Sequence, residues 1–382
     1  MAVNGKEKRR RGRPTWCFFA GGGDPSLAEG GGGRLENGKR QKPTHLVVTV
    51  NGIVGSAGNW RFAAKKIIKR YPEDIIVHCS KCNYSTLTFD GVDIMGERLA
   101  KEVMSVVAQR PELRSISFVA HSLGGLIARY AIGILYGQSA LRNSSGENGE
   151  NKFQESATEY LEQKSKGRIA GLDPMNFITF ATPHLGSRWH KQIPILCGSY
   201  TLEKMAHRIS SIAGRTGKHL FLKDKDDGKP PLLLQMISDY GDFQFISALQ
   251  SFKRCVAYSN VSSDFIVGWK TSSIRCQQDL PKCERFTKNL KYPHVVYVEK
   301  PKSSSMQNED FSENTIYQLK SPNEIEDTLI KGLNRVPWER VDVNFRKSRQ
   351  RIFAHSTIQV KTYAINSAGK DVIFHMIDNF LL

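Results

Sequence analysis

Residues 118–125 read Phe118-Val119-Ala120-His121-Ser122-Leu123-Gly124-Gly125, which places a serine between a run typical of a buried strand and the start of an apolar helix. A nucleophilic serine at such a turn has strained backbone, and the positions two before and two after it must be tiny. Ala120 and Gly124 occupy those positions, and the alanine adds only a methyl group to the usual glycine. We therefore predict that Ser122 is a nucleophile, in preference to a serine that caps an ordinary helix.

Strand-like and helix-like segments alternate on both sides of this serine. The predicted strands are 45–50, 74–79, 115–120, 175–182, 255–260 and 338–345. The predicted helices are 60–71, 92 to about 110, the segment after Ser122, and 371–382. Apolar side chains three and four residues apart mark the helices, and β-branched runs mark the strands. This alternation predicts an α/β fold, with a mostly parallel sheet covered by helices on both faces.

The chain divides into a tail and one domain with insertions. Residues 1–43 are rich in glycine and charge without apolar periodicity, so we predict a disordered basic tail. Residues 44–382 are expected to form a single α/β domain, a class that often exceeds 250 residues. Polar or irregular sequence predicts insertions at about 137–167, 187–250 and 265–335. The middle insertion falls where a helical lid over the pocket is expected.

The loop after the first predicted strand suits the stabilisation of a developing negative charge, which needs two converging backbone N–H groups. One is expected from the residue after the nucleophile, Leu123. The loop reads Asn51-Gly52-Ile53-Val54-Gly55-Ser56, and Ile53 is our candidate for the second donor. Gly52 would let the backbone approach the substrate closely, and we expect it to line the pocket with His121. The alternative is a plain glycine turn.

The general base is expected late in the chain, because the order for this arrangement is serine, acid, histidine. His355 follows the last predicted strand across a polar, basic loop, and we favour it. His375 lies inside the predicted terminal helix, where a histidine is more often a packing or surface residue. His294 precedes an apolar pair and would have to be reached differently.

The acid is expected to orient the imidazole and to stabilise its protonated form. Asp264 follows the predicted strand at 255–260 in a polar loop, which suits that role. The alternative role for Asp264 is an Asx-turn or a helix cap. Asp239 and Asp242 are the nearest rivals, but they fall inside the insertion at 187–250.

The segment Thr182-Pro183-His184-Leu185-Gly186-Ser187 closes another predicted strand. Its proline and glycine indicate a rigid loop at the carboxyl edge of the sheet, where a pocket belongs. His184 is therefore a candidate pocket-lining residue. It is not a candidate for the base, because it precedes Asp264 in the chain.

Charge and cysteine content limit the partners and the compartment. A net charge of +18 favours anionic partners, either a lipid surface or nucleic acid. Arg11-Gly12-Arg13-Pro14 is the core of a minor-groove hook, but without a folded DNA-binding module nucleic acid is the weaker expectation. Seven cysteines without a secretory signal indicate an intracellular, cytoplasmic protein that is not secreted. Plastid or nuclear targeting by the basic N-terminus remains an alternative.

No metal and no organic cofactor are expected. Cys79 and Cys82 form a CxxC, but no second CxxC and no histidine pair with zinc-like spacing supports a metal site. No stretch approaches the roughly 20 consecutive apolar residues that span a bilayer. The oligomeric state is not predicted.

Together these residues resemble the putative serine esterase family DUF676, whose members are lipase-like α/β-hydrolases. The resemblance runs from about His45 to the C-terminus and rests on Val50-Asn51-Gly52-Ile53, Ala120 to Gly125, Ala181 to Gly186, Asn260 to Asp264 and Ala354-His355. It implies ester hydrolysis on lipid-like acyl substrates, with Ser122, Asp264 and His355 as the catalytic residues.

We therefore predict a serine hydrolase that cleaves lipid-like or small esters through an acyl-enzyme intermediate. A catalytically silent lipid-binding or trafficking module on the same fold is the alternative from another class, because fold does not fix function. A thioesterase or acyltransferase would use the same three residues. The positive charge adds the expectation of peripheral association with anionic membrane surfaces.

Overall fold

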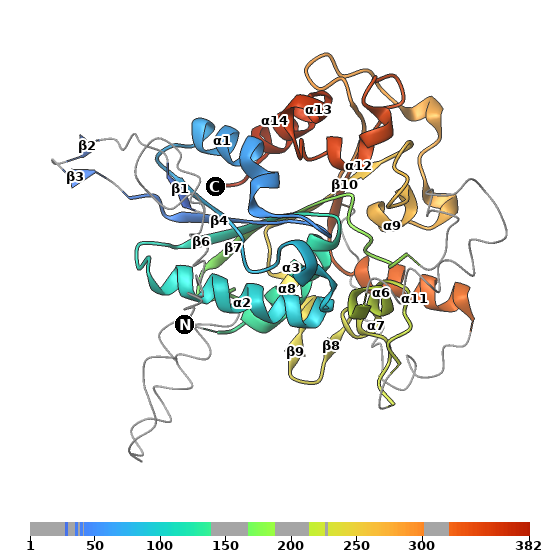
Figure 1. The fold of residues 1–382 in the computed structure, drawn as a ribbon, viewed down its shortest axis with the longest axis horizontal. Coiled ribbons are helices and arrows are strands. Elements are labelled where there is room, and N and C mark those ends of the chain that lie inside the picture. Colours follow the sequence, from blue (N-terminus) through green and yellow to red (C-terminus); the bar gives the residue numbers. More distant parts are fainter. Residues whose placement is uncertain are drawn as a thin grey trace, which may run out of the picture.

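The computed structural model describes residues 42–138, 167–187, 214–225, 228–301 and 321–382, and the backbone of three short strands before residue 42. A twisted sheet forms the middle layer, with helices on both faces (Figure 1). Within those ranges, no helix combines the length and the apolar character that crossing a membrane requires.

The main sheet has eight strands in the order β1-β5-β4-β6-β7-β10-β12-β11. The parallel strands are β5 (Ile75–Cys79), β4 (His45–Val50), β6 (Ser115–His121), β7 (Asp173–Phe180), β10 (Arg254–Asn260) and β12 (Trp338–Val343). The edge strands β1 (Leu27–Glu29) and β11 (Val295–Glu299) pair antiparallel. Because the central strands are parallel, the segments that follow them meet at one carboxyl edge.

Helices bury both faces of this sheet (Figure 1). One face is covered by α2 (Val92–Ala108), α3 (Leu123–Leu135), α8 (Phe245–Gln250) and α11 (Pro322–Leu333), and the other by α1 (Arg61–Arg70) and α14 (Lys370–Asp378). Side chains alternate between the two cores, so that Leu46 and Val48 of β4 face the first and Val47 the second. Burial on both faces explains the continuous β-branched runs of these strands.

Shorter elements connect these layers. They are α6 (Gly214–Leu220), α7 (Leu232–Gln235), α9 (Trp269–Ser273), α12 (Ala354–Thr357), α13 (Tyr363–Asn366), and the two-stranded ribbons β2 (Leu35–Glu36) with β3 (Lys39–Arg40) and β8 (Asp239–Tyr240) with β9 (Phe243–Gln244). Of these, α12 matters most for the site, because it follows β12 at the carboxyl edge.

Every strand and long helix predicted from the sequence is present, with ends that differ by a few residues. Two regions for which the sequence predicts no regular structure contain regular elements. The tail 1–43 contributes β1 to the sheet, because β5 otherwise has an unpaired edge, and the segment 265–335 contains β11 and α11. The sequence of β11 is rich in valine, but only Val295 is buried, because β11 pairs antiparallel at the edge of the sheet. Residues 1–26, 139–166, 188–213 and 302–320, which hold much of the predicted tail, lid and insertions, lie outside the described residues.

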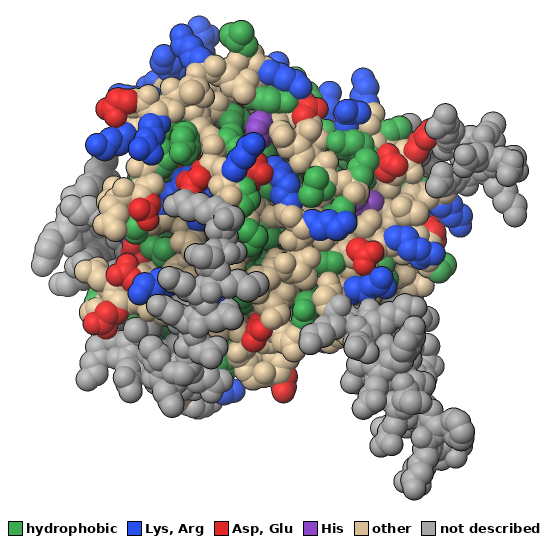
Figure 2. Space-filling model, turned by 180° about the vertical axis from the view of Figure 1, so that it is seen from behind, with side chains coloured by type: hydrophobic (Ala, Val, Ile, Leu, Met, Phe, Trp, Pro, Cys, Tyr) green, Lys and Arg blue, Asp and Glu red, His purple; other side chains and the backbone are tan. Residues whose placement is uncertain are grey.

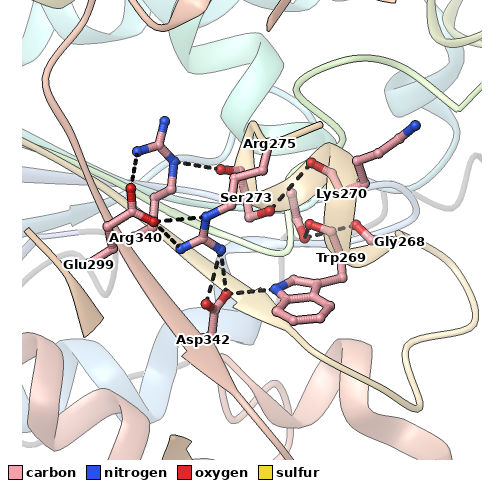
Figure 3. A network of polar contacts seen from close by, with 9 residues as sticks. Gly268, Trp269, Lys270, Ser273, Arg275, Glu299, Arg340 and Asp342 are labelled. Carbon is pink, nitrogen blue, oxygen red and sulfur yellow. Dashed lines mark hydrogen bonds and ion pairs between the residues drawn. The ribbon is translucent and has the colours of Figure 1, made fainter. Parts of the chain in front are cut away.

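A buried ion pair ties the segment after β10 to the neighbouring strand β12 (Figure 3). Arg275 donates to both carboxylate oxygens of Asp342 at 3.0 Å, and Trp269 Nε1 donates to the same carboxylate at 2.7 Å. Glu299 of β11 accepts from Arg275 at 2.9 Å and from Arg340 at 3.3 Å. Burial raises the pKa of Asp342, although Arg275 opposes that shift. The segment after β10, which carries the candidate acid, is thereby fixed to β12, which precedes the candidate base.

Asp342→Asn should lower the free energy of unfolding by about 2–4 kcal/mol, because it leaves the Arg275 charge buried with one partner fewer. The matched control is Asp90→Asn, which breaks the half-exposed pair with Arg98 and should change the same quantity by at most about 1 kcal/mol. Urea unfolding of the three proteins measures both values. Equal effects of the two substitutions would contradict a structural role for the buried pair.

Candidate active site

Ser122 lies on the turn between β6 and α3, in a backbone conformation that few side chains adopt. Its φ is 54° and its ψ is −129°. A positive φ at a residue other than glycine stores strain, which persists only where the surroundings hold it. The Ser122 N–H donates to the carbonyl oxygen of Phe180 in β7 at 2.8 Å. The turn is thus held by the neighbouring strand.

Small residues are required around this turn because other backbone passes very close to it. A β-carbon on Gly124 would lie 2.5 Å from the carbonyl oxygen of Val50 and 2.7 Å from that of Asn51. A β-carbon on Gly52 would lie 2.8 Å from the Cβ of Ser122. The loop after β4 therefore packs directly against the serine.

His355 lies at the other side of Ser122, on the short helix α12. Its Nε2 is 3.0 Å from Ser122 Oγ, and its Nδ1 is 3.0 Å from Asp264 Oδ2. The Asp264 carboxylate accepts the hydrogen bond of the Nδ1–H group, so the unprotonated Nε2 is left to accept the hydrogen bond of the serine hydroxyl. The structure brings together the three residues that the sequence singles out, from positions 233 and 91 residues apart.

Asp264 is held by donors on every side of its carboxylate. Its Oδ1 accepts the N–H groups of Ile266 and Val267 at 3.0 and 2.9 Å, and its Oδ2 accepts Asn260 Nδ2 at 2.8 Å. Burial would raise the pKa of Asp264, but the adjacent His355 and these hydrogen bonds hold it below its ordinary value. The side chain therefore stays ionised. The Asx-turn alternative is also present, because the same carboxylate caps its own loop.

His121, which the sequence predicts to line the pocket, contacts His355. Its Nε2 is 2.7 Å from the backbone carbonyl oxygen of His355, and the two rings lie 4.7 Å apart. A carbonyl only accepts, so Nε2 carries the proton. Burial lowers the pKa of His121 well below the ordinary value, which keeps the ring neutral. The side chain thus positions the helix that carries His355, a role without a sequence signal.

His184, which the sequence predicts to line the pocket, packs among buried side chains. Its side chain is fully buried, with Nε2 3.0 Å from Thr179 Oγ1 and the ring packed edge-on against Trp338 at 5.2 Å.

The rival candidates are engaged elsewhere. His375 Nδ1 lies 2.8 Å from the hydroxyl of Tyr258, and His294 Nδ1 lies 2.9 Å from Asp371. Asp239 accepts the N–H groups at the start of α8, as a helix cap. Among the described residues, no group of three or more His, Cys, Asp or Glu side chains is arranged to hold a metal ion.

The two predicted oxyanion donors belong to the segments that meet at Ser122. Leu123 is the first residue of α3, where helix N–H groups lack a partner within the helix. Ile53 follows Gly52, which touches the serine, in a loop closed by a 3.0 Å bond from the N–H of Gly55 to the carbonyl of Gly52. The N–H of Val54 is already donated to Thr88, so Ile53 remains the donor candidate of this loop.

The lowered pKa of Asp264 predicts how its contribution to stability changes with pH. Its ionised form stabilises the fold above the ordinary aspartate pKa of about 3.9, and this stabilisation is lost as the pH falls toward the lowered folded-state pKa. The difference in free energy of unfolding between the wild type and Asp264→Asn should therefore be largest near neutral pH and shrink below about pH 4. Urea unfolding across this range measures it. A difference that grows on acidification would contradict the assignment.

Comparison with known proteins adds the family. The family model described as "Putative serine esterase (DUF676)" matches residues 40–278, which include Ser122 and Asp264 but end before His355, short of the C-terminal extent expected from the sequence. Proteins named as putative lipases in Schizosaccharomyces pombe and Saccharomyces cerevisiae are 28% and 30% identical, each over 61% of this chain. The chain spans only 26% and 29% of those relatives' own lengths.

Among solved structures, a Bacillus licheniformis lipase, BlEst2, matches 63% of this chain and 75% of its own, with 15% identity and a TM-score of 0.32. The Legionella pneumophila phospholipase PlaB matches 58% of this chain and 38% of its own, with 12% identity and a TM-score of 0.34. The strand order and the serine turn are those of an α/β-hydrolase. This chain belongs to the DUF676 serine esterase family.

Proposed function

We propose that this protein hydrolyses carboxylic esters of lipid-like substrates, with Ser122 as nucleophile, His355 as general base and Asp264 as the orienting acid. The observation that carries the proposal is the continuous hydrogen-bonded chain from the serine oxygen through both imidazole nitrogens to the carboxylate, with each link at 3.0 Å. The names of the fungal relatives support a lipid-like acyl group.

In the first half-reaction, Ser122 Oγ attacks the ester carbonyl carbon while His355 Nε2 takes the hydroxyl proton. The carbonyl oxygen becomes an oxyanion, which the N–H groups of Ile53 and Leu123 stabilise. When the tetrahedral intermediate collapses, the bond to the alcohol breaks and His355 returns the proton to the leaving oxygen. The acyl group then remains on Ser122.

In the second half-reaction, water replaces the alcohol. His355 takes a proton from the water as its oxygen attacks the acyl carbon, and returns that proton to Ser122 Oγ as the acid leaves. Asp264 keeps the required tautomer of His355 and stabilises the imidazolium. Its lowered pKa supports this role, because a protonated carboxyl group could do neither. His121 acts as a positioning residue through the His355 carbonyl.

Ser122→Ala should abolish turnover of p-nitrophenyl butyrate beyond a residual background, because the attacking oxygen is removed. Ser105→Ala is the matched control on the exposed surface of α2 and should retain wild-type kcat/KM. Initial rates over a range of ester concentrations measure both. Unchanged turnover in Ser122→Ala, with a folded protein by circular dichroism, would refute the proposed nucleophile.

Gly52→Ala should reduce kcat by a factor on the order of 10²–10³, because the added methyl group displaces the loop that carries the Ile53 donor. Gly58→Ala provides the control, since a β-carbon there meets nothing closer than Ser56 Oγ at 3.5 Å. Thermal unfolding of both variants checks that the fold persists. If both variants are equally active, the loop after β4 does not serve the reaction.

A further inference from the structure

Five large apolar side chains are exposed directly beside the candidate active site. They are Val54 (58% exposed), Phe265 (50%), Ile266 (57%), Ile352 (61%) and Phe353 (47%). We call this set the apolar rim. It accounts for five of the twelve large hydrophobic side chains that are exposed in the described part of the chain. A concentration of this kind marks an interaction surface, whereas scattered single residues do not.

The rim side chains come from three segments of the chain. These segments meet because the neighbouring residues Ser122, His355 and Asp264 are hydrogen-bonded in sequence. Val54 lies two residues after Gly52, which packs against Ser122. Phe265 and Ile266 follow Asp264, and Ile352 and Phe353 precede His355. Since Asp264 Oδ2 and Ser122 Oγ both lie 3.0 Å from the His355 ring, the three segments that carry the rim side chains meet at the carboxyl edge of the sheet.

A run of exposed cations leads into the rim. Arg346, Lys347, Arg349 and Arg351 are all exposed, and we call them the basic arm. From residue 343 to residue 370 the sequence contains no Asp or Glu. Figure 2 shows Lys and Arg side chains gathered toward the top of the molecule, where the C-terminal elements lie, with hydrophobic side chains between them.

We infer that the apolar rim and the basic arm together dock this protein onto an anionic lipid bilayer. Apolar side chains enter the boundary between headgroups and acyl chains, and adjacent Lys and Arg side chains pair with lipid phosphates. Nucleic acid would match the charge of the arm but gives exposed aliphatic side chains such as Ile266 and Ile352 nothing to enter. The exposed apolar side chains of the rim therefore favour an anionic lipid bilayer over nucleic acid as the partner.

This inference deepens the proposed function and rests on it in one respect. Docking through the rim would place Ser122 near the depth of the lipid ester bonds. Substrate would then enter from the membrane rather than from water. The docking itself requires no chemistry. It can be measured with Ser122→Ala, whose failure to turn over ester has no bearing on binding.

The test is co-sedimentation of the full chain, carrying Ser122→Ala, with vesicles of phosphatidylcholine containing phosphatidylserine and with vesicles of phosphatidylcholine alone. Binding is expected to the anionic vesicles and to fall with added salt. Each cation near an anionic surface strengthens partitioning about five-fold. Arg349→Glu with Arg351→Glu should therefore weaken binding at least about ten-fold. Phe265→Ser with Ile352→Ser should weaken it to a similar extent at high salt, where charge contributes less.

The matched control is Lys42→Glu with Lys253→Glu, which makes the same change of charge at exposed residues preceding β4 and β10, on the opposite edge of the sheet. This control variant should bind the anionic vesicles nearly as strongly as the Ser122→Ala protein does. The rim and arm variants should keep the circular dichroism spectrum and the thermal unfolding midpoint of the Ser122→Ala protein, which shows that they remain folded.

The inference is overturned if the Ser122→Ala protein does not bind anionic vesicles. It is equally overturned if the control variant loses as much vesicle binding as the arm variant. It is also overturned if the arm variant loses binding to duplex DNA while vesicle binding is unchanged. Loss of ester turnover in the wild type with vesicle binding intact would remove the proposed function and leave the docking surface in place.

Discussion

The close packing of two backbone segments at Ser122 is the constraint on which the rest of this structure depends. The serine has a φ of 54°, and glycine at positions 52 and 124 is what allows the loop after β4 to touch the turn after β6. Strain of this kind is stable only inside a rigid frame, and the parallel pairing of β4 with β6 and of β6 with β7 provides it. The same contact places Ser122 at the edge of the sheet, between the segments that carry the candidate N–H donors Ile53 and Leu123.

The remaining polar groups are arranged so that residues distant in sequence meet at that oxygen. Asp264 and His355 follow adjacent strands, β10 and β12, which the buried Arg275–Asp342 pair also links. His121 holds the His355 backbone from the strand that carries the nucleophile. The site is therefore built from the ends of three strands, and a change in the register of any one would separate the three side chains.

Much of this arrangement could be predicted from the sequence, because its causes are local. The tiny residues around Ser122, the β-branched strands and the serine-acid-histidine order are visible as patterns, and they identify three side chains that the structure places in contact. Their catalytic roles remain a proposal. The hydrogen bond from His121 to the His355 carbonyl could not be predicted, because no residue pattern marks a side chain that bonds to the backbone of a distant loop. The burial of the His184 side chain could not be predicted either, because a strand-end position fixes the edge of the sheet but not the direction of a side chain.

The most direct measurement of the central claim is mass-spectrometric mapping after reaction with a fluorophosphonate. Such a probe forms a covalent bond only with a serine oxygen that is deprotonated by a neighbouring base. A single adduct on Ser122 is expected in the wild type, with labelling strongly slowed in His355→Gln. No adduct on the folded wild type, an adduct on another residue, or labelling of Ser122 at the same rate without His355 would contradict the proposed pairing of nucleophile and base.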